Sequence, residues 1–319
     1  MARTSRRGSG DGAGLKAGEW HGVMPAITTP FTDADATTID LDFLGSHARW
    51  MCERGCSGIV SPGSLGEGAT LNMEERIAIW RTLVPAVAPR PVVAAIAAAS
   101  TADAVAMARH AHEAGCRGLM VLPPYVFKGT WEELAGHVKA VAAATPLGCM
   151  LYNNPAAYGV DFLPERIVEL TLEIPNLHAV KESSGDARRV TAIRALCGSR
   201  LAVFVGLDDC LLEGVRMGAH GWVAGLANAM PEESVALFDD ALRGDYGRAE
   251  TIYRWFLPLL RMDVDPLFVQ LIKLVQAQVG MGREHVRAPR LPVSGPAREE
   301  ALRVIRAAAG TRPLGASRA

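Results

Sequence analysis

The sequence predicts an α/β fold, a (β/α)8 TIM barrel with a C-terminal three-helix appendix. Eight short apolar runs alternate with eight segments of helical periodicity over about 220 residues, which is the usual size of such a barrel. The apolar runs lack strict alternation, as expected of parallel strands that are buried on both faces. An open doubly wound sheet is the competing fold, but no G-x-G-x-x-G motif follows the first strand.

The elements follow one another in a regular order. The expected strands are residues 23–28, 58–61, 92–96, 118–122, 147–152, 177–181, 202–206 and 221–224. The expected helices of the barrel are residues 41–54, 73–87, 101–114, 131–144, 164–172, 186–196, 208–217 and 231–242. Pro164 suits the first position of its helix, and Gly55, Gly115 and Gly218 suit helix C-termini.

After residue 242 only helical patterns continue, at residues 246–260, 265–279 and 297–308. We therefore expect four parts: a disordered tail at 1–19, the barrel at 20–243, a C-terminal helical region at 244–310 and a frayed tail at 311–319. Residues 1–19 are rich in Arg, Gly and Ser without an apolar run, so they do not resemble a secretory signal. The C-terminal helical region shows no evident chemistry of its own.

Composition excludes several classes of function. The chain has 319 residues, 49% of them hydrophobic, and a formal net charge of −1, so it lacks the basic surplus expected for a nucleic acid partner. No apolar window approaches the roughly 20 residues that a membrane span needs. The 6 cysteines are scattered in apolar surroundings, which favours a reducing, cytoplasmic location. Cys52 and Cys56 have a metal-compatible spacing, but no second pair follows, so we expect no metal site.

Lysine is rare in this chain. Of the 33 basic residues only Lys16, Lys128, Lys139, Lys181 and Lys273 are lysines. Lys181 alone ends an expected strand, and the active face of such barrels lies at the carboxyl ends of the strands. A poorly hydrated lysine there has a lowered pKa, and its free amine can attack a carbonyl carbon. The alternative is a structural lysine paired with Glu182 or another carboxylate at the rim.

Tyr152 ends the preceding expected strand, so its phenol is expected to face the same cavity as Lys181. A tyrosine hydroxyl can give and take the protons that imine chemistry moves, although a buried structural tyrosine is the common alternative. The loop at residues 62–68 holds three glycines, whose backbone N–H groups can turn inward to bind a carboxylate. Asp208 and Asp209 are expected to cap a helix.

Several motifs in collinear order resemble the dihydrodipicolinate synthase / N-acetylneuraminate lyase superfamily. They are Gly22-Val23-Met24-Pro25-Ala26, Thr29-Pro30-Phe31, Gly63-Ser64-Leu65-Gly66-Glu67, Tyr152-Asn153-Asn154-Pro155, Val180-Lys181-Glu182-Ser183-Ser184 and Gly206-Leu207-Asp208-Asp209, and the match runs from about residue 22 to residue 292.

The resemblance implies a catalytic set of Lys181, Tyr152 and Ser64. Lys181 would form a Schiff base with a 2-oxo acid without any cofactor, and Tyr152 would shuttle protons. The backbone of Ser64 and Leu65 would bind the substrate carboxylate. A homotetramer or homodimer is also implied by the resemblance.

Departures from the synthase point to another branch. Where the synthase carries two threonines, a second tyrosine and an arginine for the carboxylate of its aldehyde substrate, this chain has Ser64 and Leu65, Val126 and Ala157. Loss of the charge-assisted arginine contact costs on the order of 2 kcal/mol or more in substrate binding. Residues 152–161 and 221–225 resemble the branch that deaminates 1-pyrroline-4-hydroxy-2-carboxylate to 2-oxoglutarate semialdehyde.

We therefore expect a lyase or hydrolytic deaminase that acts on a small-molecule 2-oxo acid or cyclic imino acid. The alternatives are 4-hydroxy-tetrahydrodipicolinate synthase, another pyruvate-dependent aldolase or dehydratase, and a non-catalytic relative that binds a 2-oxo acid. Specificity is expected around Tyr125, Ala157, Tyr158 and Val223, which with Leu65 form the expected substrate-binding set.

Overall fold

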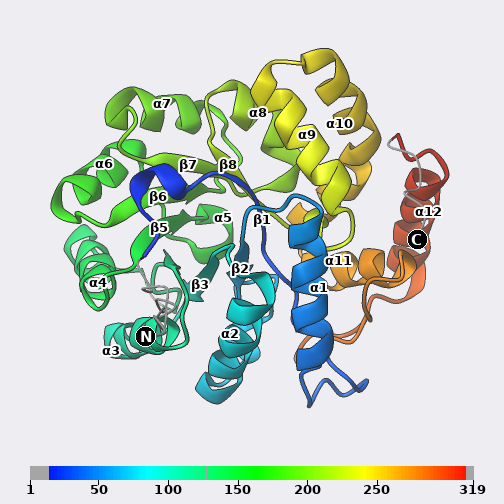
Figure 1. Cartoon of the computed structure of the whole chain (residues 1–319), viewed down its shortest axis with the longest axis horizontal. Coiled ribbons are helices and arrows are strands. Elements are labelled where there is room, and N and C mark those ends of the chain that lie inside the picture. Colours follow the sequence, from blue (N-terminus) through cyan, green and yellow to red (C-terminus); the bar gives the residue numbers. More distant parts are fainter. Residues whose placement is uncertain (1–13, 127, 314–319) are drawn as a thin grey trace, which may run out of the picture.

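Eight parallel strands form one sheet in the computed structural model, which describes residues 14–126 and 128–313. The strands are β1 (Gly22–Pro25), β2 (Ile59–Ser61), β3 (Val92–Ile96), β4 (Gly118–Val121), β5 (Gly148–Asn153), β6 (Leu177–Glu182), β7 (Ala202–Val205) and β8 (Gly221–Ala224). Their order is β1-β8-β7-β6-β5-β4-β3-β2, and a parallel bridge from Ala26 to Val60 joins the two edges. The predicted (β/α)8 barrel is confirmed (Figure 1).

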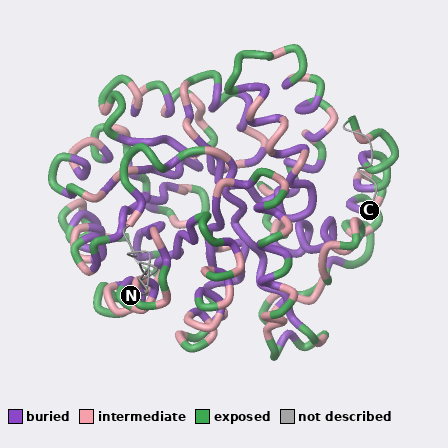
Figure 2. Tube along the Cα trace, viewed as in Figure 1, coloured by how far each residue is buried: buried purple, intermediate pink, exposed green. Residues whose placement is uncertain are grey.

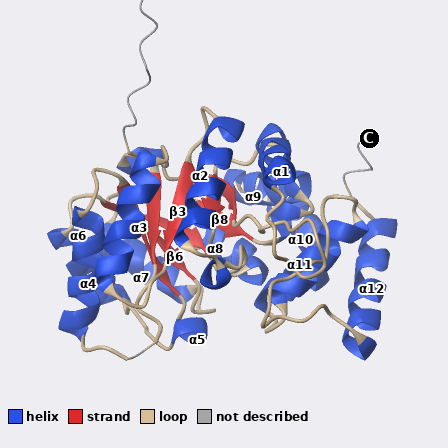
Figure 3. Ribbon diagram, turned by 90° about the horizontal axis from the view of Figure 1, so that it is seen from below, coloured by secondary structure: helices blue, strands red, loops and turns tan. Residues whose placement is uncertain are grey.

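Helices surround the strands and continue beyond them (Figure 3). The helices are α1 (Leu41–Glu53), α2 (Met73–Val87), α3 (Thr101–Glu113), α4 (Trp131–Ala143), α5 (Pro155–Tyr158), α6 (Pro164–Glu173), α7 (Arg188–Cys197), α8 (Leu211–Arg216), α9 (Pro231–Arg243), α10 (Tyr246–Leu260), α11 (Phe268–Gln278) and α12 (Gly295–Gly310). Helices α10, α11 and α12 gather at one side of the barrel, as predicted for the appendix (Figure 1). No helix in the described ranges is long and apolar enough to cross a membrane.

Local sequence accounts for many of these boundaries. Asn72 and Thr130 cap α2 and α4, and in each case a glutamate three residues later completes a capping box. Strand β3 is buried along its whole length, as its unbroken apolar run predicts. Figure 2 shows the buried core as the strands and the inward faces of the helices around them.

Some elements differ from the prediction. Strand β1 ends at Pro25 because Thr28 turns away, with its backbone N–H donating to Asn228 Oδ1. Helix α11 begins at Phe268 and not at residue 265, because the Asp265 carboxylate accepts from the Leu267 N–H and Pro266 precedes the helix. The short helix α5 was not predicted, since four residues carry no detectable period.

The predicted tails are partly ordered. Leu15 is buried and Trp20 packs edge-on against Phe204, with 6.4 Å between ring centroids, so residues 14–19 are not a loose tail. The Arg312 guanidinium donates from NH2 to the buried Glu233 carboxylate at 2.8 Å, so the chain is not frayed at residue 312. The remainder of both predicted tails, 1–13 and 314–319, lies outside the described residues. The division at residue 243 stays a prediction.

Candidate active site

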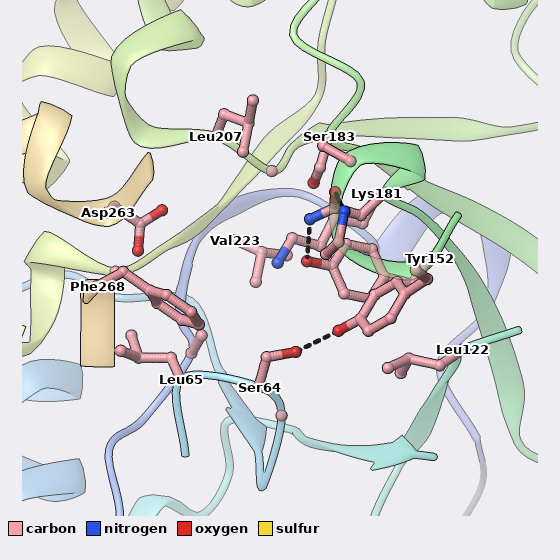
Figure 4. Close-up of a pocket in the computed structure, with 18 of the residues that line it drawn as sticks. Ser64, Leu65, Leu122, Tyr152, Lys181, Ser183, Leu207, Val223, Asp263 and Phe268 are labelled. Carbon is pink, nitrogen blue, oxygen red and sulfur yellow. Dashed lines mark hydrogen bonds between the residues drawn. The ribbon is translucent and has the colours of Figure 1, made fainter. Parts of the chain in front are cut away.

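Tyr152 and Lys181 lie side by side at the mouth of the barrel. They are direct partners in the β5–β6 ladder, so their side chains point the same way. The Lys181 Nζ lies 4.2 Å from the centroid of the Tyr152 ring (Figure 4), and the two residues are only 7% and 5% exposed. This pairing depends on a register shift, because Cys149 pairs with Leu177 but Met150 pairs with Ala179, leaving His178 as an extra residue in β6.

Lys181 does not form the ion pair with Glu182 on which the alternative interpretation depends. Its neighbour Glu182 accepts hydrogen bonds from Asn153 Nδ2 at 3.0 Å and from the Ser184 N–H at 2.7 Å. No carboxylate among the described residues forms an ion pair with Lys181. A Cβ at Gly206 would lie 2.7 Å from Lys181 Cε, so this glycine leaves room for the lysine stem.

Burial sets the reactivity of the amine. It lowers the pKa of Lys181, and the opposing attraction of Asp263, Tyr158 and Asp208 offsets this only in part. The free amine is therefore populated at lower pH than in an exposed lysine. An unpaired amine of this kind is suited to attack an electrophilic carbon.

Two phenols extend the site. The Tyr152 hydroxyl accepts from Asn154 Nδ2 at 3.1 Å, and the Tyr158 ring meets the Tyr152 ring edge-on with 5.6 Å between centroids. The Tyr158 hydroxyl forms a hydrogen bond with Ser64 Oγ (Figure 4). Burial raises the pKa of both phenols, so they stay protonated at neutral pH and can donate. Ser64, Tyr158 and Tyr152 thus provide a polar path from the glycine loop toward Lys181.

The glycine loop has the form expected for binding a carboxylate. The Glu67 N–H donates to Ser64 O at 3.1 Å, while the N–H groups of Ser64 and Leu65 donate no hydrogen bond within the described ranges. Glu67 itself is buried, in the left-handed region at φ 55°, and its carboxylate accepts from Lys273 Nζ at 2.5 Å and from the Arg287 N–H at 2.9 Å. The loop is therefore fixed from α11, which the sequence did not suggest.

Asp208 does not cap the helix that follows it, so that prediction was wrong. Its buried carboxylate accepts from Trp222 Nε1 at 2.9 Å and from the N–H groups of Gly225 and Leu226 at 3.0 and 2.7 Å. These donors lie at the end of β8, so Asp208 ties the ends of two neighbouring strands together. Burial raises the pKa of Asp208 to about 6.

One cavity brings the candidate residues together. It has a volume of about 590 Å³ and opens at the carboxyl ends of the strands. It is lined by every candidate site residue named from the sequence: Ser64, Leu65, Tyr125, Tyr152, Ala157, Tyr158, Lys181 and Val223. Their shared location is a structural finding, and their individual roles stay predictions.

The C-terminal helical region also reaches this cavity, contrary to expectation. The 3-10 turn η5 (Arg261–Val264) contributes Asp263, α11 contributes Phe268, and the segment before α12 contributes Arg290. The sequence signal was Asp263 in the gap between the helical patterns at 246–260 and 265–279, with Asp265 and Pro266 shortly after it. The lining is otherwise mainly apolar, and the described residues contain no cluster of three metal-ligating side chains.

A parallel barrel with a buried, unpaired lysine and a tyrosine beside it at the mouth defines the class of Schiff-base aldolases. Residues 19–308 match the model of the Dihydrodipicolinate synthetase family. The chain belongs to this family, and it is accordingly a Schiff-base lyase.

Relatives and solved structures agree with this membership. The chain is 36% identical over 285 residues to 4-hydroxy-tetrahydrodipicolinate synthase of Halorhodospira halophila, covering 88% of this chain and 94% of the relative. It is 33% identical over 289 residues to the synthase of Syntrophus aciditrophicus, covering 89% and 97%. The structure of the synthase from Methylacidiphilum fumariolicum SolV superposes with a TM-score of 0.86 at 27% identity, covering 91% and 96%.

A further solved structure of this family holds a ligand. YagE, a prophage protein of the same family from E. coli K12, was solved in complex with pyruvate. It superposes with a TM-score of 0.85 at 26% identity, covering 91% of this chain and 99% of that chain.

We expect Tyr152→Phe to slow formation of the pyruvate imine by about 100-fold, because the ring contact with Lys181 remains while the acid–base hydroxyl is lost. Samples are quenched with borohydride at successive times, and mass spectrometry gives the fraction of the chain that carries the reduced adduct. Tyr246→Phe, remote on α10, is the matched control and should react as the unmodified chain does. An unchanged rate of imine formation in Tyr152→Phe would contradict the role of Tyr152 as the proton shuttle.

Proposed function

We propose that this chain deaminates 1-pyrroline-4-hydroxy-2-carboxylate to 2-oxoglutarate semialdehyde through an imine on Lys181. The observation that carries the proposal is Ala157, which lines the cavity on α5 at the position where the synthase holds an arginine. The one arginine among the described lining residues is Arg290, whose NH1 lies 3.8 Å from the buried Glu67 carboxylate that also pairs with Lys273. The site therefore offers little support for the second carboxylate of an acidic aldehyde.

The chemistry begins with imine exchange. The Lys181 amine adds to C2 of the ring, and the bond from C2 to the ring nitrogen breaks, so that this nitrogen becomes a primary amine on C5. The substrate carboxylate would be held by the N–H groups of Ser64 and Leu65. A phenol at Tyr152 donates the proton that the departing nitrogen needs.

Loss of water and ammonia follows. Removal of a proton from C3 gives an enamine, and the 4-hydroxyl leaves as water. Proton transfer from C5 to C3 then gives an enamine at C4 and C5, whose imine tautomer is hydrolysed to the aldehyde and ammonia. Hydrolysis of the lysine imine releases the 2-oxo acid, so two waters are consumed, one is produced, and the net reaction uses one.

A second candidate is condensation of pyruvate with aspartate semialdehyde. It is favoured by the relatives above, which are 33% and 36% identical and are named 4-hydroxy-tetrahydrodipicolinate synthase. This reaction would use the same lysine and tyrosine. It would need another group in place of the arginine that Ala157 replaces.

Two assays on the purified chain separate the candidates. We expect ammonia release from 1-pyrroline-4-hydroxy-2-carboxylate and little product from pyruvate with aspartate semialdehyde. The ring compound without its 4-hydroxyl is the control, since it can form the imine but cannot lose water. Activity in the condensation assay alone would overturn the proposal in favour of the second candidate.

A further inference from the structure

Asp263 is an acidic residue of the cavity that the mechanism above does not use. It lies in η5, which follows α10, and it lines the same cavity as Lys181 and Val223. In Figure 4 its carboxyl group and the Lys181 side chain appear on either side of Val223. No lysine or arginine in the described part of the chain forms an ion pair with it.

The fold makes a specific place for this carboxyl group. A Cβ at Gly225 would overlap Asp263 Oδ1 and would lie 3.2 Å from Asp208 Oδ2. Gly225 is itself held by its N–H bond to the Asp208 carboxylate at 3.0 Å. Asp263 therefore packs against Gly225 at the end of β8, and Gly225 is held in turn by Asp208, which follows β7. The barrel thus helps to define the position of the Asp263 carboxyl group.

Charge in the cavity is unevenly distributed. Burial raises the pKa of Asp263, and the neighbouring Asp208 adds to this, whereas Lys181 opposes it. When Lys181 becomes a protonated imine, it remains cationic and continues to favour the ionised form of Asp263. A substrate bound through this imine thus meets the carboxyl group of Asp263 on one wall and Ala157, without charge, on another.

We propose that Asp263 is a substrate-binding residue that accepts a hydrogen bond from a hydroxyl or amino group distal to the imine carbon, and that a distal carboxylate, which has no hydrogen to donate, binds less well there. This inference rests on the proposed function and names the substrate class of that site. In the cyclic imino acid the donor is the 4-hydroxyl, joined after ring opening by the amine on C5. A distal carboxylate has no hydrogen to donate to Asp263, and Ala157 stands where the synthase arginine would bind it.

The test measures selectivity in adduct formation, which needs no deamination. The full chain is titrated with pyruvate, with 4-hydroxy-2-oxopentanoate and with 2-oxoglutarate, and each imine is reduced with borohydride and identified by mass. We expect the unmodified chain to prefer the hydroxylated acid over the dicarboxylate by more than roughly tenfold in half-saturating concentration. In Asp263→Asn this preference should fall by about tenfold.

Asp42→Asn, at an exposed position on α1, is the matched control and should keep the selectivity of the unmodified chain. Asp263→Ala is the second variant and should lose the preference as Asp263→Asn does. Unchanged selectivity in both Asp263 variants, or loss of the pyruvate adduct in both, would overturn the role of Asp263 and leave the proposed function standing. Absence of any adduct in the unmodified chain would overturn the proposed function as well.

Discussion

Lys181→Arg should form no borohydride-stable adduct with pyruvate or any other 2-oxo acid, and its turnover should fall by at least roughly 10⁴-fold. A guanidinium stays protonated in proteins, so it cannot attack C2 of the substrate. After reduction with borohydride, the unmodified chain should carry the reduced ligand covalently on Lys181, with the corresponding increase in mass. Peptide mapping after reduction gives the modified residue directly.

The rate of adduct formation on Lys181 should depend on pH. Adduct formation requires the free amine, so its rate should rise with pH and reach a plateau below 10.5, the ordinary pKa of lysine, because burial lowers the pKa of Lys181. Lys139→Arg, exposed on α4 and paired with Glu173, is the matched control and should react normally. An adduct on another lysine, or a full yield in Lys181→Arg, would contradict the assignment.

Lys273→Met should lower the free energy of unfolding by about 3–5 kcal/mol, because it leaves the Glu67 carboxylate buried without its main partner. Burial lowers the pKa of Lys273 to about 8, against the attraction of Glu67, so the pair is held in a poorly solvated place. The measurement is equilibrium unfolding in urea. Since Glu67 lies in the same loop as Ser64 and Leu65, separated from Leu65 only by Gly66, the half-saturating concentration of pyruvate should also rise.

The double variant Glu67→Gln with Lys273→Met separates charge burial from packing. It removes both charges, and we expect it to recover at least half of the lost stability. Lys139→Met breaks an exposed pair and should cost under about 1 kcal/mol. A double variant no more stable than Lys273→Met would mean that packing, and not an unpaired carboxylate, explains the loss.

The fold and most of the candidate cavity follow from local sequence patterns. Strand ends can be read from apolar runs, and all parallel strands of a barrel present their carboxyl ends at one face, so Lys181 and Tyr152 could be placed together. Asp263 and Lys273 could not be placed in this way. Lys273 meets Glu67 across 206 residues, and no period or spacing reports such a contact. Asp208 precedes a helix, as capping residues do, but its donors come from another strand.

The extra residue in β6 has a consequence for comparing sequences. His178 shifts the register between Cys149 and Met150, and without that shift Tyr152 would stand opposite Val180. If His178 instead paired with Met150, every reactive side chain would still be encoded, and yet Lys181 would be displaced by one residue and would point to the opposite face of the sheet. The presence of the motifs alone therefore does not indicate that a member of this family is catalytically active. The pairing of β6 with β5 must also place the lysine opposite the tyrosine.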